Sequence, residues 1–386
     1  MRKNRFGDSI TLVQGHPFRS QLFNERGDGM PLVRIRDVKR GRSNTYTTEE
    51  CPVAQIVEDG ALLIGMDGDF NLARWSGGRA ALNQRVMMLG SSKDGTSVEF
   101  AALWLEPQLE RIHASTTFTT VKHLSSRVVA ALPFDPPPLD KQRRIVDLIA
   151  AVDDAVDAAE AEADTAKTAR DEMLTAMLAA RDGWRETTLS DVVGASRDRY
   201  RPRDYDEAAE VILYSIPALD SHGGPEVTTA GGILSDKFAI STDAVLVSML
   251  NPRIPRRIRA YGGENVACST EFAVLRSDSV ALTLEYLSVI TRQAAFFEFL
   301  DRRAKGSTGS RKRAKIADAL AFPIALPPLD EQRRIVATVE SVDDALDAAR
   351  ATADALRELR SNLLTVLLSG EHEIPSSYDA LLEEVA

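Results

Sequence analysis

Pro-Pro-Leu-Asp-Lys-Gln-Arg-Arg-Ile-Val at residues 137–146 returns as Pro-Pro-Leu-Asp-Glu-Gln-Arg-Arg-Ile-Val at residues 327–336, and only Lys141 and Glu331 differ. At the same separation, Val152-Asp153-Asp154-Ala155 returns as Val342-Asp343-Asp344-Ala345. A ten-residue string with one change does not repeat by chance, so the chain is a tandem duplication. A duplicated chain can place two similar domains about a pseudo-twofold axis.

The composition is that of a soluble globular protein, with 44% hydrophobic and 27% charged residues in a chain of 386. This length allows two or three domains. The sequence lacks a run of apolar residues long enough to span a membrane, and its first residues lack the apolar core of a signal peptide. We therefore expect a cytoplasmic protein. Cys51 and Cys268 fit no metal-ligand spacing, so we expect no metal site.

The net charge of −10 is unevenly distributed along the chain. Residues 1–134 carry a net charge of +3 and residues 184–323 carry +1, whereas residues 135–183 carry −6 and residues 324–386 carry −8. The acidity therefore lies in the two segments that contain the repeated string. The segments between them are mildly basic and contain basic clusters, which is compatible with nucleic-acid binding.

Each copy of the repeated string is predicted to open a long helix. The prolines at 136–138 and 327–328 cannot lie inside a helix, and Asp140 and Asp330 follow them as plausible N-caps. We expect the first helix to end near residues 181–183 and Gly370 to cap the second. About 40 residues at ~1.5 Å each predict a rod of roughly 60 Å.

Both predicted helices carry an apolar seam whose spacing alternates between four and three residues. The seam positions are Ile145, Ile149, Val152, Val156, Ala159, Ala163, Ala166, Arg170, Met173 and Met177 in the first helix, and Ile335, Val339, Val342, Leu346, Ala349, Ala353, Leu356, Arg360, Leu363 and Leu367 in the second. A repeat of 3.5 residues is typical of a coiled coil, since a solitary buried helix has a broader apolar stripe.

The polar exception in each seam is an arginine, Arg170 or Arg360, at the same position of the repeat. A parallel pair would press these two guanidinium groups together, whereas an antiparallel pair brings each arginine to the start of the other helix. Buried charge needs a partner. We therefore predict an antiparallel pair with Arg170 near Asp343 or Asp344 and Arg360 near Asp153 or Asp154. In the alternative interpretation, both arginine stems lie along the seam edge with their charges in water.

The segments that precede the two helices are also related. Residues 243–249 align with residues 60–66 at a separation of 183, and both runs are predicted as buried strands. Residues 271–275 and 85–89 indicate another shared strand, while residues 282–300 and 98–112 indicate helices. The fold class is predicted as α+β, with two α/β domains alternating with two long helices. The predicted boundaries are 1–134, 135–183, 184–323, 324–370 and an acidic tail, 371–386.

The duplicated string at the head of a long helix resembles the specificity subunit of type I restriction–modification systems. The resemblance covers nearly the whole chain and includes Trp184-Arg185-Glu186-Thr187-Thr188-Leu189-Ser190-Asp191 at the start of the second domain. Pro31-Leu32-Val33-Arg34-Ile35-Arg36-Asp37-Val38 is similar to the strand and loop of target recognition domains in that family. The chain departs from the pattern at its N-terminus, where no tryptophan matches Trp184.

The resemblance implies a non-catalytic subunit that recognises DNA. Each α/β domain would read one half of a split target, and the helices would hold the readers apart and dock two modification subunits. Double-stranded DNA, modification subunits and restriction (motor-nuclease) subunits are the implied partners. S-adenosylmethionine, ATP and Mg²⁺ would be bound by those partner subunits, and no cofactor by this chain.

DNA contact requires Lys and Arg for phosphates, and a few Arg, Asn, Gln, Ser or Thr side chains for base edges. The second domain offers a stretch from 251 to 259, predicted as a proline-stiffened loop, and a glycine-containing stretch from 305 to 315. The candidate DNA-binding residues there are Asn251, Arg253, Arg256, Arg257, Arg259, Lys305, Ser307, Thr308, Arg311, Lys312 and Lys315.

In the first domain the candidate residues are Arg34, Arg36, Lys39, Arg74, Arg79 and Lys122. Arg34 and Arg36 are predicted to share one face of a strand, opposite Val33 and Ile35. Residues 69–79 are predicted as a second loop, equivalent in position to residues 251–263. All of these basic segments are also open to the simpler interpretation of solvated surface loops.

Other classes of function fit the sequence less well. Asp135-Pro136-Pro137-Pro138 lacks the aromatic residue that adenine methyltransferases place after such prolines, and the chain has no Walker A lysine or glycine-rich cofactor loop of the required type. We therefore predict no catalytic residues. Two alternatives remain, a specificity chain of a type II-like system and a structural coiled-coil scaffold. Salt-dependent duplex binding would argue against the scaffold.

Overall fold

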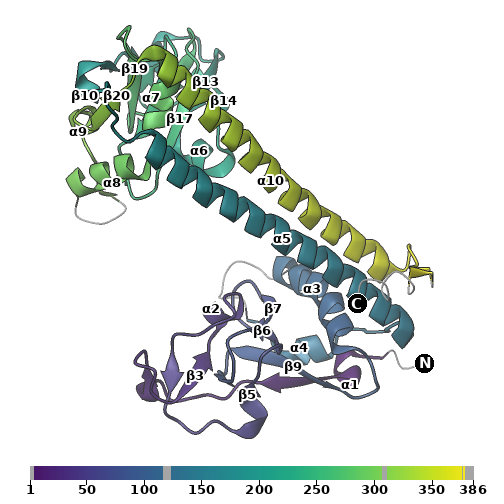
Figure 1. Cartoon of the computed structure of the whole chain (residues 1–386). Coiled ribbons are helices and arrows are strands. Elements are labelled where there is room, and N and C mark those ends of the chain that lie inside the picture. The colour runs from purple at the N-terminus through teal and green to yellow at the C-terminus, as the bar shows by residue number, and fades with distance from the viewer. Residues whose placement is uncertain (1–3, 116–122, 307–310, 376, 379–386) are drawn as a thin grey trace. The chain divides into compact units, whose positions relative to one another are not determined.

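The computed structural model describes residues 4–115, 123–306, 311–375 and 377–378, and the chain forms two compact units (Figure 1). Unit 1 comprises Met1–Ala158 and Ala353–Ala386, and unit 2 comprises Ala159–Thr352. The division falls inside two long helices, α5 (Leu139–Met177) and α10 (Leu329–Ser369). Each unit therefore contains the first part of one long helix and the last part of the other.

Unit 1 contains a four-stranded antiparallel sheet and a five-stranded mixed sheet. The first has the order β1 (Ile10–Gln14), β9 (Val86–Ser92), β6 (Leu62–Gly65), β7 (Leu72–Arg74), and the second has the order β2 (Phe23–Asn24), β4 (Tyr46–Thr47), β3 (Met30–Val33), β8 (Ala80–Leu82), β5 (Ile56–Val57). The shorter helices are α1 (Phe6–Ser9), α2 (Ile35–Val38), α3 (Val98–Ser115) and α4 (Ser126–Ala130), with 3₁₀ turns at Ser20–Leu22 and Val53–Gln55.

Unit 2 contains two sheets of the same sizes and a two-stranded sheet. Their orders are β11 (Val193–Ser196), β19 (Phe272–Ser277), β16 (Ala244–Ser248), β17 (Arg257–Ala260); then β12 (Arg199–Tyr200), β15 (Lys237–Ala239), β18 (Val266–Cys268), β13 (Glu210–Tyr214), β14 (Glu226–Thr229); and β10 (Arg185–Thr188), β20 (Pro323–Leu326). The helices are α6 (Ile216–His222), α7 (Leu284–Ile290), α8 (Ala294–Arg303) and α9 (Ile316–Leu320), with 3₁₀ turns at Leu189–Asp191, Pro202–Asp204 and Ala230–Gly232.

The two units share a plan that confirms the predicted α+β class. The four-stranded sheets correspond strand for strand, and each five-stranded sheet has a parallel pair inside it, β3 with β8 and β13 with β18. Strands β8 and β9 lie 186 residues before β18 and β19. The apolar alignment predicted buried strands at these positions, and β6 and β16 confirm it, because both are completely buried along their length.

Two predictions, one of a strand face and one of a helix, are wrong. The strand β3 ends at Val33, so Arg34 and Arg36 do not share a strand face; the Asp37 side chain accepts a hydrogen bond from the backbone N–H of Arg34 and opens α2 instead. The helix predicted over 282–300 is interrupted after Ile290, where the buried Thr291 hydroxyl bonds to the carbonyls of Leu287 and Ser288.

The N-caps and the two predicted loops also differ from expectation. The long helices begin one residue before Asp140 and Asp330, because the carbonyls of Pro138 and Pro328 accept their first hydrogen bonds. The aspartates lie in the first turn, where the helix dipole favours negative charge.

Residues 257–260 and 72–74 are edge strands rather than loops. In β17, Ile258 packs against the core between Arg257 and Arg259, which gives the alternation of a strand.

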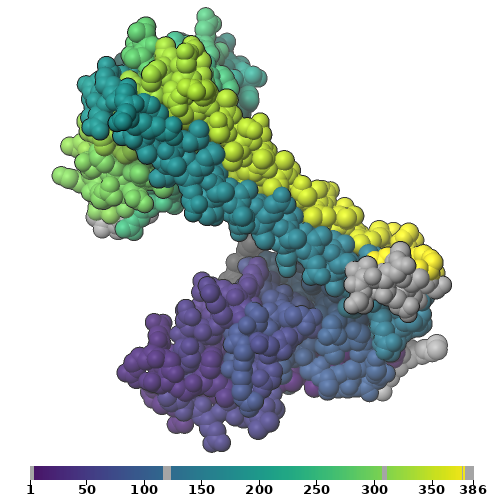
Figure 2. All heavy atoms as spheres, viewed as in Figure 1, coloured from purple at the N-terminus to yellow at the C-terminus, as the bar shows by residue number. Residues whose placement is uncertain are grey.

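Within each unit, the parts of α5 and α10 lie side by side and run in opposite directions. In unit 1, Ile145 and Ile149 pack in one cluster with Leu364 and Leu367. The predicted seam residues are buried or half-buried, and the burial of residues 152–156 is the same, position by position, as that of residues 342–346. Gly370 ends α10 with φ +76, as predicted. Between the seam positions, most side chains of both helices are exposed, and much of the helix surface that faces the viewer is open in Figure 2.

Among the described residues, no helix is both long enough and apolar enough to cross a lipid bilayer.

A buried glutamine connects each long helix to the domain beside it. Gln142, 3% exposed, accepts a hydrogen bond from Ser97 N (2.8 Å) and donates to Pro137 O (2.7 Å). Gln332 is fully buried, accepts from Thr283 N (3.0 Å), and donates to Ala281 O (2.7 Å) and Pro327 O (2.9 Å). The repeated string therefore carries a side chain that binds the start of the neighbouring helix, α3 or α7.

We predict that Gln332→Ala lowers the free energy of unfolding by about 2–4 kcal/mol, because it leaves buried backbone groups without partners. Chemical denaturation followed by circular dichroism measures the loss. Gln21→Ala is the control, since Gln21 is exposed and its replacement should change stability by less than about 0.5 kcal/mol. Equal effects of the two substitutions would show that the buried hydrogen bonds do not fix the helix to the domain.

Candidate nucleic-acid interface

Two adjoining concave surfaces in unit 1 meet at Arg36 and gather basic and amide side chains. The first, of about 660 Å³, is lined by Glu25, Arg36, Asp37, Arg40, Arg42 and Asn44. The second, of about 540 Å³, is lined by Phe18, Ser20, Phe23, Arg34, Ile35, Arg36, Asn83, Gln84 and Arg85. We call these residues together the Arg36 surface. Its five arginines exceed its two carboxylates, so the surface attracts polyanions.

Most arginines of the Arg36 surface are available to a ligand. Within the described part of the chain, Arg34, Arg40 and Arg42 form no ion pair. Arg36 donates a hydrogen bond to Thr45 Oγ1 (3.0 Å) and lies 3.9 Å from Asp37. These groups can exchange weak internal contacts for phosphate oxygens at little cost.

Among the members of this surface that the sequence analysis missed, Asn83, Gln84 and Arg85 come from one segment. They follow β8, while Arg34 follows β3, and these two strands run parallel with Val33 opposite Leu82. Because parallel strands end at the same edge of a sheet, their carboxyl-terminal residues meet there. An amide can pair with an adenine edge and an arginine with a guanine edge. The sequence signal that could have identified these three residues is a polar triplet directly after an apolar run.

The remaining candidates of the first domain are dispersed. Arg74 donates to Gly60 O (3.0 Å), and Arg79 pairs with Glu58 (2.7 Å). Lys39 is exposed at the end of α2, next to the Arg36 surface. Lys122 lies outside the described residues, as do Ser307 and Thr308 of the second domain.

In unit 2 the two predicted basic stretches come together. The backbone N–H of Asn251 donates to Lys312 O (2.8 Å), and Arg253 and Lys312 both approach Asp301, at 3.2 and 3.9 Å. Asn251 has a positive φ of 48, which is uncommon for a residue with a side chain and marks a fixed turn. Lys305, Arg311 and Lys315 form no ion pair among the described residues.

Several arginines of this second cluster already have carboxylate partners inside the unit. Arg256, whose side chain is 13% exposed, forms two hydrogen bonds to Asp220 (2.6 and 2.8 Å), and these bonds lower the pKa of that carboxyl. Arg259 binds Glu285 (2.7 Å), and Arg257 donates to Ser288 Oγ (3.0 Å). A phosphate would have to replace these partners.

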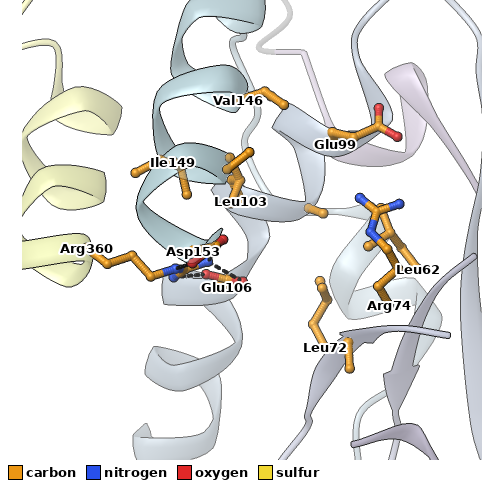
Figure 3. Close-up of a pocket in the computed structure, with 13 residues that line it drawn as sticks. Leu62, Leu72, Arg74, Glu99, Leu103, Glu106, Val146, Ile149, Asp153 and Arg360 are labelled. Atoms are coloured by element: carbon orange, nitrogen blue, oxygen red, sulfur yellow. Dashed lines mark hydrogen bonds and ion pairs between the residues drawn. The ribbon is translucent and has the colours of Figure 1, made fainter. Parts of the chain in front are cut away.

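Each unit also holds one seam arginine in an ion cluster. In unit 1, Arg360 reaches from α10 to Asp153 on α5 and to Glu106 on α3, the latter at 3.0 and 3.4 Å (Figure 3). Burial lowers the pKa of Arg360, but the hydrogen bonds from its guanidinium to the two carboxylates outweigh burial and raise it.

In unit 2, Arg170 binds Asp343 (3.3 Å) and Asp171 (2.6 Å), and Arg292 also pairs with Asp343. Both interhelical ion pairs predicted from the sequence are thus confirmed, and the alternative of arginines extended into water is wrong.

Part of the chain is similar to a known protein family. Residues 6–166 match the family model described as the type I restriction modification DNA specificity domain.

A curated relative, the type I restriction enzyme EcoBI specificity subunit of Escherichia coli, is 40% identical over 151 residues. That match covers 38% of this chain and 32% of the relative, so the chain matches about a third of the relative's length.

Two solved structures are similar over almost the whole chain. The S subunit of a type I restriction-modification system from M. genitalium has a TM-score of 0.54 at 15% identity, covering 94% of this chain and 95% of that one. A structure described as the basis of complex assembly and conformational transition of the type I R-M system has a TM-score of 0.57 at 17% identity, covering 94% and 96%. These likenesses show that the chain has the fold of those proteins.

We predict that Arg360→Ala lowers the free energy of unfolding by about 1–3 kcal/mol, because Asp153 and Glu106 lose a charged hydrogen-bond donor. A double-mutant cycle with Asp153→Ala should give a coupling energy of about 1–2 kcal/mol. Arg350→Ala is the control, since Arg350 lies on the same helix but its ion pair with Asp347 is exposed. Additive effects of Arg360→Ala and Asp153→Ala would contradict a stabilising pair.

Proposed function

We propose that this chain is the DNA-specificity subunit of a type I restriction–modification complex. The match of residues 6–166 to the specificity-domain model carries the proposal, and the internal duplication extends it to the second domain. Each domain reads one half of a bipartite target. The chain has no catalytic site of its own and serves as the recognition subunit of an enzyme complex.

In the first domain, the Arg36 surface binds the half-site. Arg34, Arg40 and Arg42 contact phosphates, as do Lys39 and Lys122 beside them. Asn83 and Gln84, at the edge where β3 and β8 end, read bases. The free guanidinium groups and the concave shape support these roles.

In the second domain, the residues equivalent to Asn83, Gln84 and Arg85 are Ser269, Thr270 and Glu271. The candidates of the cluster formed by residues 251–259 and 305–315 contact the other half-site, with Ser307 and Thr308 among them. Because the side chains at the same edge of the sheet differ in donors and acceptors, the two domains read different half-sites.

We predict that Arg34→Ala with Arg42→Ala weakens duplex binding about tenfold to a hundredfold and reduces the slope of log affinity against log salt by about two. Fluorescence anisotropy over a series of salt concentrations measures both quantities. Arg127→Ala is the control, because Arg127 is exposed in the same unit but lies outside the Arg36 surface. Binding of the wild-type chain that is independent of salt would favour the coiled-coil scaffold instead.

The two long helices form an antiparallel coiled coil with a pseudo-twofold internal repeat, and their outward faces dock two modification subunits. The opposite direction of the helices within each unit and the equal burial of the two seams support the coiled coil. The outward acids are duplicated too: Asp154 and Asp157 return as Asp344 and Asp347, and all four are exposed. Solvent exposure alone does not require this repetition, whereas a partner bound twice does.

We predict that Asp154→Lys with Asp157→Lys reduces the number of bound modification subunits from two to one, because the charge that attracts a basic partner surface is reversed at one dock. Analytical ultracentrifugation of the reconstituted complex gives the stoichiometry. Glu50→Lys with Glu110→Lys makes the same change in net charge on exposed positions outside the long helices and should leave two subunits bound. A full complement on the first variant would place the dock elsewhere.

S-adenosylmethionine for adenine methylation, and ATP and Mg²⁺ for translocation and cleavage, are bound by the modification and restriction subunits. The complex acts in the cytoplasm, where the DNA is. Mapping of methylated adenines in the host genome tests the proposal as a whole, because a specificity subunit of this kind predicts a two-part motif with a fixed spacer. A type II-like system with a separate specificity chain would show the same motif without a restriction subunit.

A further inference from the structure

A cavity of about 400 Å³ in unit 2 lies between β17, α7 and the first part of α10. It is lined by Arg257, Ile258, Arg259, Tyr261, Glu285, Ser288, Val289, Arg292, Val339, Glu340 and Asp343. Three arginines therefore share one cavity. Arg257 and Arg259 belong to the stretch that is proposed above to contact DNA, but the cavity itself has no role in that proposal.

Unit 1 contains the equivalent cavity, of about 230 Å³, between β7, α3 and α5 (Figure 3). The strand registers establish the equivalence, since Leu62 opposes Arg74 in unit 1 and Val245 opposes Arg259 in unit 2. On the helices, Glu99 corresponds to Glu285 and Asp153 to Asp343. The two cavities are thus two copies of one structural element.

Three positions differ in charge between these copies. Glu340 of unit 2 corresponds to the uncharged Ala150 of unit 1, at the same separation as Asp343 and Asp153. Leu72 of unit 1 corresponds to Arg257 of unit 2, because each lies two residues before the arginine that opposes the central strand. Glu106 on α3 corresponds to Arg292, which lies two residues after the end of α7. Relative to unit 1, unit 2 has therefore gained two guanidinium groups, while the carboxylate lost at the position of Glu106 is balanced by Glu340.

The arginines of the unit 2 cavity differ in their carboxylate partners: Arg259 binds Glu285 (2.7 Å), whereas Arg257 has none among the described residues. In unit 1, Arg360 is held by two carboxylates, Asp153 and Glu106. In unit 2, Asp343 serves both Arg170 and Arg292. Arg257 forms no ion pair among the described residues and donates only to the Ser288 hydroxyl.

Two N–H groups in the cavity are also without an acceptor. The Nε atoms of Arg259 and Arg292 are buried and form no hydrogen bond among the described residues. Burial, together with the neighbouring Arg292 and Arg170, lowers the pKa of Arg257 to about 9. Among these arginines, Arg257 is the buried cation without a carboxylate partner in the described part of the chain, and such a charge is costly unless an anion joins it.

We propose that the cavity of unit 2 binds a small oxyanion of the phosphate class, held by Arg257 and Arg292 with Arg259 at the side. A planar guanidinium presents two parallel N–H groups that match two oxygens of such an anion. Because Arg257 and Arg259 also belong to the stretch proposed to contact DNA, the experiment below measures phosphate binding and duplex binding separately.

The same oxygens are available from a free phosphate ion or from a phosphodiester of bound DNA. Glu285, Glu340 and Asp343 also line the cavity and repel an extended polyanion, which favours the free ion. An acidic group of a partner subunit that binds both units is a poor source of these oxygens. In unit 1, the same acidic group would face the carboxylate of Glu106, which stands at the position of Arg292.

Equilibrium dialysis of the full chain against radiolabelled inorganic phosphate, at constant ionic strength, tests the site. We expect saturable binding that Arg257→Leu weakens about tenfold to a hundredfold, since one charged hydrogen-bond donor is lost. Unit 1 has Leu72 at the equivalent position, so leucine is compatible with this structural element. Arg203→Leu is the control, because Arg203 is 77% exposed elsewhere in unit 2.

Thermal melting tests whether Arg257→Leu is folded. If this variant does not fold, Arg257→Lys is measured instead, because lysine keeps the charge but lacks the paired N–H groups. The site would be overturned if the wild-type chain showed no saturable phosphate binding. It would also be overturned if both Arg257 variants bound phosphate as tightly as the wild-type chain. Displacement of phosphate by duplex DNA identifies the phosphodiester as the source, and undisturbed binding identifies the free ion. Loss of duplex binding with phosphate binding intact refutes the proposed function alone.

Discussion

The buried glutamine of the repeated string is the contact on which each unit depends. Gln142 and Gln332 lie in the first turn of a long helix, yet their amides bind backbone groups at the start of α3 and α7. An amide has one acceptor and two donors, and a hydrophobic side chain of similar size could satisfy neither neighbour. The orientation of each domain on its own helix segment follows from these hydrogen bonds. With this orientation, the seam arginine of the other helix can reach the same domain, as Arg360 of α10 reaches Glu106 of α3.

The two units have the same framework but differ in the side chains at the sheet edge and in the cavity. The sheet orders, the buried glutamine and the interhelical pairs Arg360–Asp153 and Arg170–Asp343 recur in both units. The side chains at the edge where the parallel strands end differ, as do those of the cavity beside the helices. Buried contacts tolerate little change because each substitution leaves a void or an unpaired group, whereas surface groups vary at small cost in stability.

The sole difference within the repeated string also has a structural counterpart. Lys141 pairs with Glu373 (2.6 Å), after the end of α10, and Glu331 approaches Arg181 (3.7 Å), after the end of α5. The charge at the start of one helix has changed together with the charge beyond the end of the other. Exposed pairs contribute little to stability, so their complementarity favours one choice of helix partner over others.

The sequence by itself determined the duplication, the two long helices, the antiparallel direction of their pairing within each unit and the α+β class. These depend on periodicity and on the need of a buried charge for a partner, which are local or repeated signals. The tertiary structure alone decided which polar residues meet. Asn83 joins Arg34 across 49 residues because β3 and β8 are parallel, and Arg256 is occupied by Asp220 because α6 lies beside it. Sequence spacing carries no such information, since contacts between distant segments are set by strand register and packing.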